Sequence, residues 1–298
     1  MQKPNRLKKG DKVVIISTAR KISGEEIQPA LELLQRWGLE VVLGDNLYQE
    51  EHQFSGTTNE RVNDLQKALD DSTIKAVFCA RGGYGTVKII DEIHFSKFIE
   101  SPKWIVGYSD VTVLHNHINQ NFNIETLHAT MPINFKTNTQ ESLTSLKKAL
   151  FGEALNYEFD AHSLNRKGKC KGILVGGNLS IIYSLTGTNS QIDTAGKILF
   201  IEDLDEYIYH VDRMMMNLKR AGMLKALSGI IVGGMSDMND NTIPFGKTAK
   251  EIILETVAEY DYPVCFGFPA GHLDDNRTLI MGAEVSLNVG EKCSLKLS

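Results

Sequence analysis

The chain has 298 residues, of which 42% are hydrophobic and 23% are charged, and these proportions are typical of a globular protein with a large core. Its 32 Lys and Arg against 37 Asp and Glu leave a formal net charge of −5 with no basic block, so no nucleic-acid partner is expected, because phosphate contacts need clustered cations. The length is above the range in which one core keeps growing, so we expect two domains.

The N-terminal residues do not resemble a secretory signal or a membrane helix. A basic start is followed by only four consecutive apolar residues, 13–16, whereas a membrane helix needs about 20. We therefore expect no membrane partner. The cysteines lie far apart with no CxxC pair, which argues against a metal-thiolate site or a dense disulfide framework. We expect free thiols in a reducing cytoplasm at the four positions Cys79, Cys170, Cys265 and Cys293.

Short apolar runs alternate with helical patterns through the first half of the chain. The pattern predicts strands at residues 12–17, 39–44, 74–80 and 103–108, with helices at 24–38, 59–71, 86–93 and 110–118. Asn59 is the expected N-cap of the second of these helices. Alternating helices and nearly continuous apolar strands predict a Rossmann-like parallel sheet flanked by helices.

The pattern changes in the second half. A polar stretch with one short helix reads as a connection, and glycine-punctuated strand–turn segments follow it. We expect an N-terminal α/β domain over residues 1–135, a linker region over 136–169, and a smaller C-terminal α/β domain, rich in short strands, over 170–298. Residues 278–290 are predicted to form a terminal hairpin.

A glycine-rich loop follows the predicted strand 74–80. It consists of Arg81, Gly82, Gly83, Tyr84 and Gly85. Glycines allow positive φ and close approach of a ligand to backbone N–H groups. The spacing matches neither of the common nucleotide-binding glycine patterns. Three interpretations stay open: a nucleotide-phosphate site, a tight turn, and a cradle for an anion or oxyanion.

A second loop carries a candidate nucleophile. Ser109 lies where the strand 103–108 meets a helix, in Gly107-Tyr108-Ser109-Asp110. A serine on such a turn is exposed above the sheet with helix N–H groups behind it, although Val111 replaces the second glycine of the G-x-S-x-G pattern. The alternative is that Ser109 or Asp110 caps the helix.

A serine nucleophile needs a base, and the base needs an orienting acid. His272 follows a predicted strand on a glycine turn, which suits acid–base chemistry, and His128 is a second candidate for the cleft. The acid candidates are Glu202 and Asp203 at the end of another predicted strand. A buried carboxylate needs a partner, which is either an imidazolium or an ordinary salt bridge to Arg213.

Six segments together resemble the LD-carboxypeptidase family of serine peptidases in order and spacing. The resemblance covers roughly residues 10–290 and rests on RGGYG (81–85), GYSD (107–110), GILVGGNLS (172–180), FIEDLDE (200–206), VDRMMMNLKRAG (211–222) and GFPAGH (267–272). It implies a triad split across two domains, with Ser109 as nucleophile, His272 as general base and Glu202 as orienting acid.

The resemblance also implies an oxyanion hole, a substrate class and an assembly. The hole would use Gly83 or Gly82 together with Asp110. The implied protein is a cytoplasmic homodimer without metal or cofactor, which cuts the bond before a C-terminal D-residue, typically the D-Ala of a recycled muropeptide. An exopeptidase also has to bind the terminal carboxylate. Arg81 is our candidate because a guanidinium matches a carboxylate, with Gly82 as a further substrate-binding residue. The alternative is that Arg81 has a structural role.

Two other functions remain open. The family includes microcin C self-immunity peptidases, which cut peptidyl-nucleotide toxins and often use an aromatic lid that stacks on the base. Trp37 and Trp104, the only tryptophans, fall in a predicted helix and a predicted strand, which weakly favours the muropeptide substrate. The third possibility is a non-catalytic module that binds a sugar or nucleotide through its glycine loops.

Overall fold

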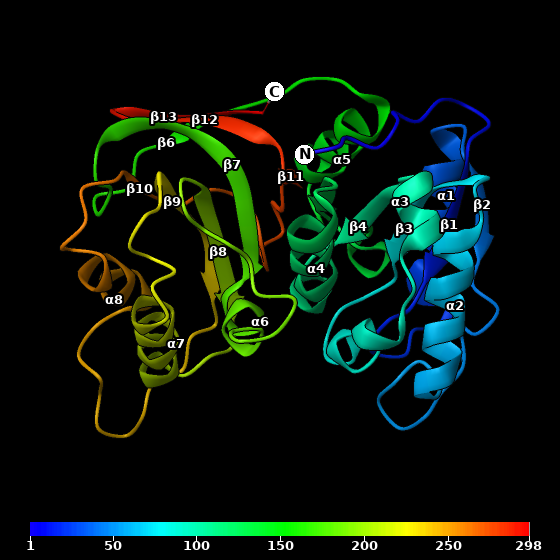
Figure 1. The fold of residues 1–298 in the computed structure, drawn as a ribbon, viewed down its shortest axis with the longest axis horizontal. Helices are drawn as coiled ribbons and strands as arrows, with labels where there is room; N and C mark the ends of the chain where they lie inside the picture. The colour runs from blue at the N-terminus through cyan, green and yellow to red at the C-terminus, as the bar shows by residue number, and fades with distance from the viewer. Residues whose placement is uncertain (298) are drawn as a thin grey trace.

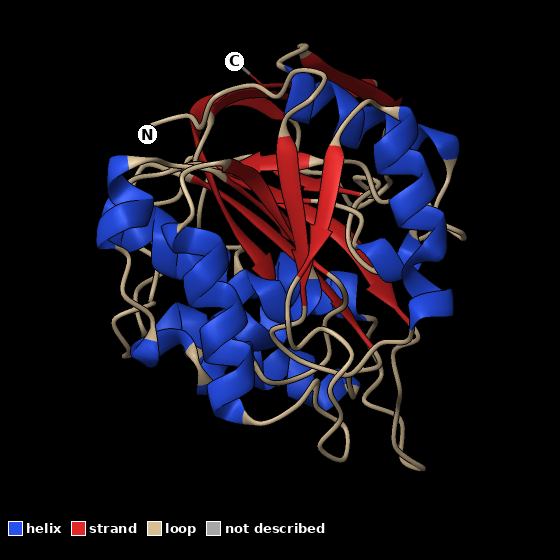
Figure 2. Cartoon of the chain, turned by 90° about the vertical axis from the view of Figure 1, so that its right-hand side faces the viewer, coloured by secondary structure: helices blue, strands red, loops and turns tan. Residues whose placement is uncertain are grey.

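The computed structural model describes residues 1–297, which form two α/β lobes side by side, each built on one sheet (Figure 1). Seen from the side, helices lie on the outside and the strands converge in the interior (Figure 2). The first sheet contains β1 (Lys12–Ile16), β2 (Glu40–Leu43), β3 (Ile74–Cys79), β4 (Trp104–Gly107), β5 (Thr126–His128) and β11 (Leu279–Met281). The fold is therefore the expected parallel sheet flanked by helices, with a second α/β unit.

The first sheet has the order β11-β5-β4-β3-β1-β2. The neighbours among β1, β2, β3, β4 and β5 are parallel, and β11 runs antiparallel to β5. From β1 the chain moves outward to β2 and then returns to β3 on the other side of β1. The loops after β1 and β3 therefore leave the sheet in opposite directions. In open α/β sheets, the crevice at such a reversal is the usual ligand site.

The helices associated with this sheet are α1 (Gly24–Arg36), α2 (Thr58–Asp70), α3 (Ser96–Glu100), α4 (Thr112–Phe122) and α5 (Gln140–Phe151). Helix α1 illustrates how the sequence forms them. Ser23 and Glu26 make a reciprocal capping box, which satisfies N–H groups at the start of the helix. Ile27, Ala30 and Leu34 then fall on one face and are completely buried in the core.

The second sheet has the order β10-β9-β8-β7-β12-β13-β6. Its members are β6 (Leu155–Asp160), β7 (Gly168–Asn178), β8 (Ile198–Leu204), β9 (Gly229–Ser236), β10 (Val264–Phe266), β12 (Glu284–Val289) and β13 (Lys292–Leu297), with helices α6 (Leu179–Ser184), α7 (Ile208–Arg220) and α8 (Ala249–Thr256). The long strand β7 joins two halves: its first part pairs antiparallel with β12 and its second part pairs in parallel with β8. No helix among the described residues has the length and apolarity that a membrane span requires.

Two expectations about the helices were wrong. The second helix is capped by Thr57 rather than Asn59, through a Thr57–Glu60 capping box that the sequence pattern itself contains. Residues 86–93 form two 3-10 turns, Thr86–Lys88 and Ile90–Glu92, instead of one helix, and the β-branched residues of this short segment disfavour a helix.

The C-terminal hairpin is shifted. Residues 278–290 do not pair with one another, because the chain turns at Gly282 with φ +92° and β11 joins β5 in the first sheet. The terminal hairpin is instead β12 with β13. The expected linker, residues 136–169, contains α5 and the strand β6, and β6 pairs with β13 at the edge of the second sheet.

The cysteines agree with expectation. All four are free; Cys170 is half-buried and the other three are buried. Among residues 1–297, no three His, Cys, Asp or Glu side chains gather closely enough to hold a metal ion.

Candidate active site

Ser109 lies on a strained turn. Strand β4 ends at Gly107, and Ser109 begins the 3-10 turn Ser109–Val111 that leads into α4, with φ +63°. The other four described non-glycine residues with positive φ are His, Asn or Asp, the types that tolerate this region best. A serine held there costs about 1–3 kcal/mol, a cost that is found mainly at functional sites.

The turn also explains the departure from G-x-S-x-G. A Cβ on Gly107 would come within 2.8 Å of the Val111 side chain, so the first glycine makes room for Val111. No side-chain hydrogen bond caps the turn that begins at Ser109. The alternative interpretation of Ser109 as a helix cap is therefore wrong.

The glycine-rich loop packs directly against this serine. A Cβ on Gly82 would lie 2.9 Å from Ser109 Cβ, 3.0 Å from its Oγ and 3.4 Å from the Asp110 backbone nitrogen. Gly83 is exposed and has φ +113°. The absence of side chains here leaves the backbone N–H groups of the loop and of Asp110 near one another, and an oxyanion cradle requires such donors.

The Asp110 side chain has a structural role. It is buried, and its Oδ2 accepts a hydrogen bond from Thr86 N at 2.8 Å, which ties the serine turn to the end of the glycine loop. Burial raises the pKa of Asp110. The hydrogen bonds from Thr86 and the positive charge of the nearby Arg61 guanidinium lower the pKa and partly offset the effect of burial. The Asp110 backbone nitrogen lies beside the loop, 3.4 Å from the position of a Cβ on Gly82.

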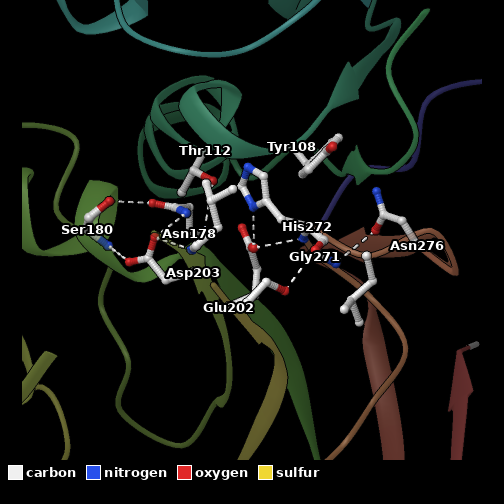
Figure 3. A network of polar contacts seen from close by, with 12 residues as sticks. Tyr108, Thr112, Asn178, Ser180, Glu202, Asp203, Gly271, His272 and Asn276 are labelled. Atoms are coloured by element: carbon white, nitrogen blue, oxygen red, sulfur yellow. Dashed lines mark hydrogen bonds and ion pairs between the residues drawn. The ribbon is translucent and has the colours of Figure 1, made fainter. Parts of the chain in front are cut away.

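His272 and Glu202 form a buried pair at the ends of two strands in the second lobe. Glu202 lies on β8, and its Oε2 accepts from His272 Nδ1 at 2.7 Å and from His272 N at 3.2 Å (Figure 3). The Glu202 side chain is 0% exposed and that of His272 is 14% exposed. A Cβ on Gly271 would lie 2.5 Å from Glu202 Oε2, so this glycine lets the turn close onto the carboxylate.

The carboxylate outweighs burial in setting the charge of the imidazole. Burial by itself lowers the pKa of His272, but the negative charge of Glu202 and its hydrogen bond raise the pKa above the ordinary histidine value. This arrangement orients the ring through Nδ1. The other ring nitrogen, Nε2, is then the one suited to exchange a proton.

Asp203, the other acid candidate, points away from the imidazole (Figure 3). Its carboxylate accepts from Asn178 Nδ2 at 2.9 Å and from Ser180 N at 2.8 Å. Burial and the Glu202 charge raise its pKa to about 7. The expected alternative of a salt bridge to Arg213 was wrong, because Arg213 instead lies over the Tyr209 ring.

The two lobes meet at this point. The Tyr108 ring packs edge-on against the His272 ring with centroids 4.8 Å apart, so the imidazole lies beside the residue that precedes Ser109. No hydrogen bond joins Ser109 to His272 among the described residues, and such contacts are often long until substrate binds. On the other side of the site, Thr112 on α4 accepts from Asn178 N at 3.0 Å. The Thr112–Asn178–Asp203 contacts were not predicted, although Asn178 lies in one of the six segments singled out in the sequence.

Two other candidate site residues within the described chain, Arg81 and His128, form no hydrogen bond with Ser109 or the Glu202 carboxylate. Arg81 donates to the Lys21 carbonyl at 3.2 Å and lies 3.7 Å from a Glu26 carboxylate oxygen. His128 is completely buried between the Tyr108 and Phe200 rings, and neither of its ring nitrogens has a hydrogen-bond partner. It is therefore behind the site, and the expectation that it lines the cleft was wrong.

Known proteins resemble this chain over nearly its whole length. The LD-carboxypeptidase N-terminal domain matches residues 13–129, and the LD-carboxypeptidase C-terminal domain matches residues 171–287. A Bacillus subtilis protein named probable murein peptide carboxypeptidase is 38% identical over 98% of this chain and 93% of its own. The murein tetrapeptide carboxypeptidase of Pseudomonas aeruginosa is 27% identical over 89% of each chain.

Solved structures show the same fold. The muramoyltetrapeptide carboxypeptidase from Oxalobacter formigenes superposes with a TM-score of 0.87 at 24% identity, over 96% of this chain and 98% of the other. The microcin C7 self-immunity protein MccF superposes with a TM-score of 0.88 at 22% identity, over 99% and 98%. From the matching family domains and the 38% identical relative, we conclude that this chain belongs to the LD-carboxypeptidase family.

Proposed function

We propose that this protein is a serine carboxypeptidase that hydrolyses the L,D-peptide bond before a C-terminal D-amino acid, such as the terminal D-Ala of a murein tetrapeptide. The observation that carries the proposal is the strained Ser109 packed against Gly82, with the His272–Glu202 pair beside it. The relatives named murein peptide and murein tetrapeptide carboxypeptidase support the substrate class.

In the proposed mechanism, Ser109 Oγ attacks the scissile carbonyl while His272 Nε2 takes its proton. Glu202 holds the ring through Nδ1 and stabilises the imidazolium that forms. The C–N bond then breaks, and His272 gives the proton to the leaving amine of the D-amino acid. Water, activated by His272, hydrolyses the acyl-serine ester and restores the free hydroxyl.

The oxyanion needs donors that already point at the reacting carbonyl. We assign this role to the backbone N–H groups of Asp110 and of Gly83, or Gly82, in the adjoining loop. One such donor is worth about 3 kcal/mol of transition-state stabilisation. The two halves of the site come from separate sheets. We therefore propose an N-terminal domain over residues 1–135, a linker region over 136–169 and a C-terminal domain over 170–298. We also propose that the active protein is a homodimer.

The alternative substrate is a peptidyl- or aminoacyl-nucleotide, and a solved structure of MccF holds the aminoacyl analogue aspartyl sulfamoyl adenosine. Both tryptophans of this chain are buried: Trp37 packs on Phe135, and Trp104 donates to the Asn5 carbonyl. Neither indole can stack on a base at the mouth of the site, which favours the muropeptide. A binding module without catalysis would leave the strain at Ser109 and the Glu202–His272 pair without a role.

The decisive experiment offers three substrates to the purified protein: an L,D-tetrapeptide with terminal D-Ala, its all-L isomer, and aspartyl sulfamoyl adenosine. We expect D-Ala release from the first alone, and no release by the Ser109→Ala variant. A fluorophosphonate should add one mass increment to the wild type and none to the variant. Cleavage of the nucleotide substrate alone would favour the alternative activity, and cleavage of none would favour the binding module.

A further inference from the structure

One cation at the β1–β3 crevice has no carboxylate partner. Arg20 lies in the loop after β1, and its side chain is exposed. Among residues 1–297 its guanidinium makes neither an ion pair nor a hydrogen bond. Arg81 in the neighbouring loop, by contrast, is engaged by Glu26 and the Lys21 carbonyl. Of these two arginines, only Arg20 has all its donors available for a ligand.

The Arg20 side chain packs against the glycine loop beside the serine turn. A Cβ on Gly83 would lie 2.5 Å from Arg20 Cδ and 3.1 Å from its Nε. A Cβ on the preceding residue, Gly82, would lie 3.0 Å from Ser109 Oγ. Arg20, the two glycines and Ser109 are thus consecutive neighbours along one wall, at the reversal point of the sheet where ligands bind.

The backbone that carries this side chain is held firmly. Ser17 Oγ donates to the Arg20 carbonyl at 2.7 Å, and Lys21 N donates to the Gln53 carbonyl at 3.0 Å. The isolated bridge between Arg20 and Phe54 anchors the same segment. The Arg20 backbone is therefore fixed next to the glycine loop, and only the Arg20 side chain is free to change its conformation.

We propose that Arg20 is the residue that binds the free C-terminal carboxylate of the substrate, in place of Arg81. This inference rests on the proposed function. The terminal carboxylate is attached to the carbon next to the scissile nitrogen, so its binding residue has to lie close to the nucleophile. Arginine is always charged and presents a planar pair of donors that matches both carboxylate oxygens. Arg20 would thereby restrict cleavage to the last residue of a peptide.

The test compares a tetrapeptide ending in D-Ala with the same peptide ending in D-alaninamide. For wild type we expect kcat/KM to favour the acid, and for Arg20→Gln we expect it to fall by about 10- to 100-fold on the acid alone. The ratio of acid to amide should then approach unity. Arg20→Lys should be intermediate, because lysine keeps the charge but loses the fork.

Two variants serve as controls. Lys21→Gln removes a neighbouring exposed cation that pairs with Glu50 and should leave the ratio unchanged. Arg81→Gln tests the competing residue. A ratio that survives Arg20→Gln, or collapses only in Arg81→Gln, would overturn the inference while D-Ala release by wild type upholds the proposed function. Absence of release by wild type would instead overturn the proposed function. A thermal melt of each variant separates loss of fold from loss of recognition.

Discussion

The two halves of the candidate site depend on different structural features. In the first lobe, the important features are backbone features: Ser109 at φ +63° and a loop in which Gly82 has no room for a methyl group. In the second lobe they are side-chain features, namely the Glu202–His272 hydrogen bond with both groups largely buried. One half presents a hydroxyl and N–H donors, and the other half tunes a proton acceptor.

The comparison indicates how each half should fail. A backbone cradle is sensitive to added volume, because its donors are positioned by close contact. A buried ion pair is sensitive to lost charge, because the remaining partner stays without compensation. The changes below address one half at a time.

The largest effect is expected from Glu202→Gln, which breaks the side-chain half. The amide cannot hold the imidazole in the required tautomer or stabilise its cation, so kcat should fall by about 10⁴-fold. Steady-state release of D-Ala measures it. The chain supplies a matched control in Glu206, whose Oε2 lies 2.6 Å from His210 Nδ1 in a second Glu–His pair. Glu206→Gln should retain activity, and an equal loss in both variants would contradict the assignment.

Gly82→Ala should break the backbone half with a smaller effect. The new methyl group would lie 3.0 Å from Ser109 Oγ and 3.4 Å from the Asp110 nitrogen. Displacing one oxyanion donor should lower kcat by about 10²- to 10³-fold. Gly24→Ala is the control, because its added Cβ meets only Tyr48 at 3.8 Å. Full activity of Gly82→Ala would mean that the loop is merely a tight turn.

The pH profile sharpens the side-chain half. His272 acts as a base only when neutral, and its raised pKa should put the acid limb of kcat/KM above about pH 6.5, with a tenfold loss per pH unit below it. Stability runs the other way: the contribution of this pair is complete below the ordinary histidine pKa and declines as pH rises through the raised one. A limb below pH 6 in the wild type would contradict the raised pKa.

The smallest effect on activity is expected from Asn178→Ala, which removes side-chain hydrogen bonds of the second lobe next to its contact with Thr112. The Asn178 side chain donates to Asp203 and accepts from Ile181 N as the cap of α6, and the Asn178 backbone N–H donates to Thr112 Oγ1. We expect the free energy of unfolding to fall by about 1–2 kcal/mol, with activity changed only a few-fold. Urea unfolding measures the loss, and Asn156→Ala on the exposed face of β6 is the control. An unchanged midpoint would show that the Asn178 side-chain hydrogen bonds do not stabilise the fold.

Several features of the site were predictable from local patterns. The strand-to-turn transitions at Ser109 and His272 were visible because a buried apolar run ended in glycine and polar residues at each position. The glycine loop was equally visible, although its purpose was open. The capping box at Thr57 and Glu60 was visible too and was overlooked in favour of Asn59.

Other features depend on pairings that no local pattern contains. Local pattern left Glu202 and Asp203 equivalent as adjacent acids, and only the family resemblance favoured Glu202. The strand geometry directs Glu202 to His272 and Asp203 to Asn178. In the same way, no local pattern indicates that Arg81 lies 3.7 Å from a Glu26 carboxylate oxygen.

The sequence by itself determined most of the helices and strands and the residue types available at each strand end, because these depend on neighbours within a few positions in the chain. Only the tertiary structure decided that β11 crosses to the first sheet and that Arg20, rather than Arg81, is left without a partner. Those outcomes depend on which segments, distant in the sequence, pack together. The assignment of Glu202 and Asp203 is also tertiary, because adjacent residues of a strand point to opposite faces of the sheet.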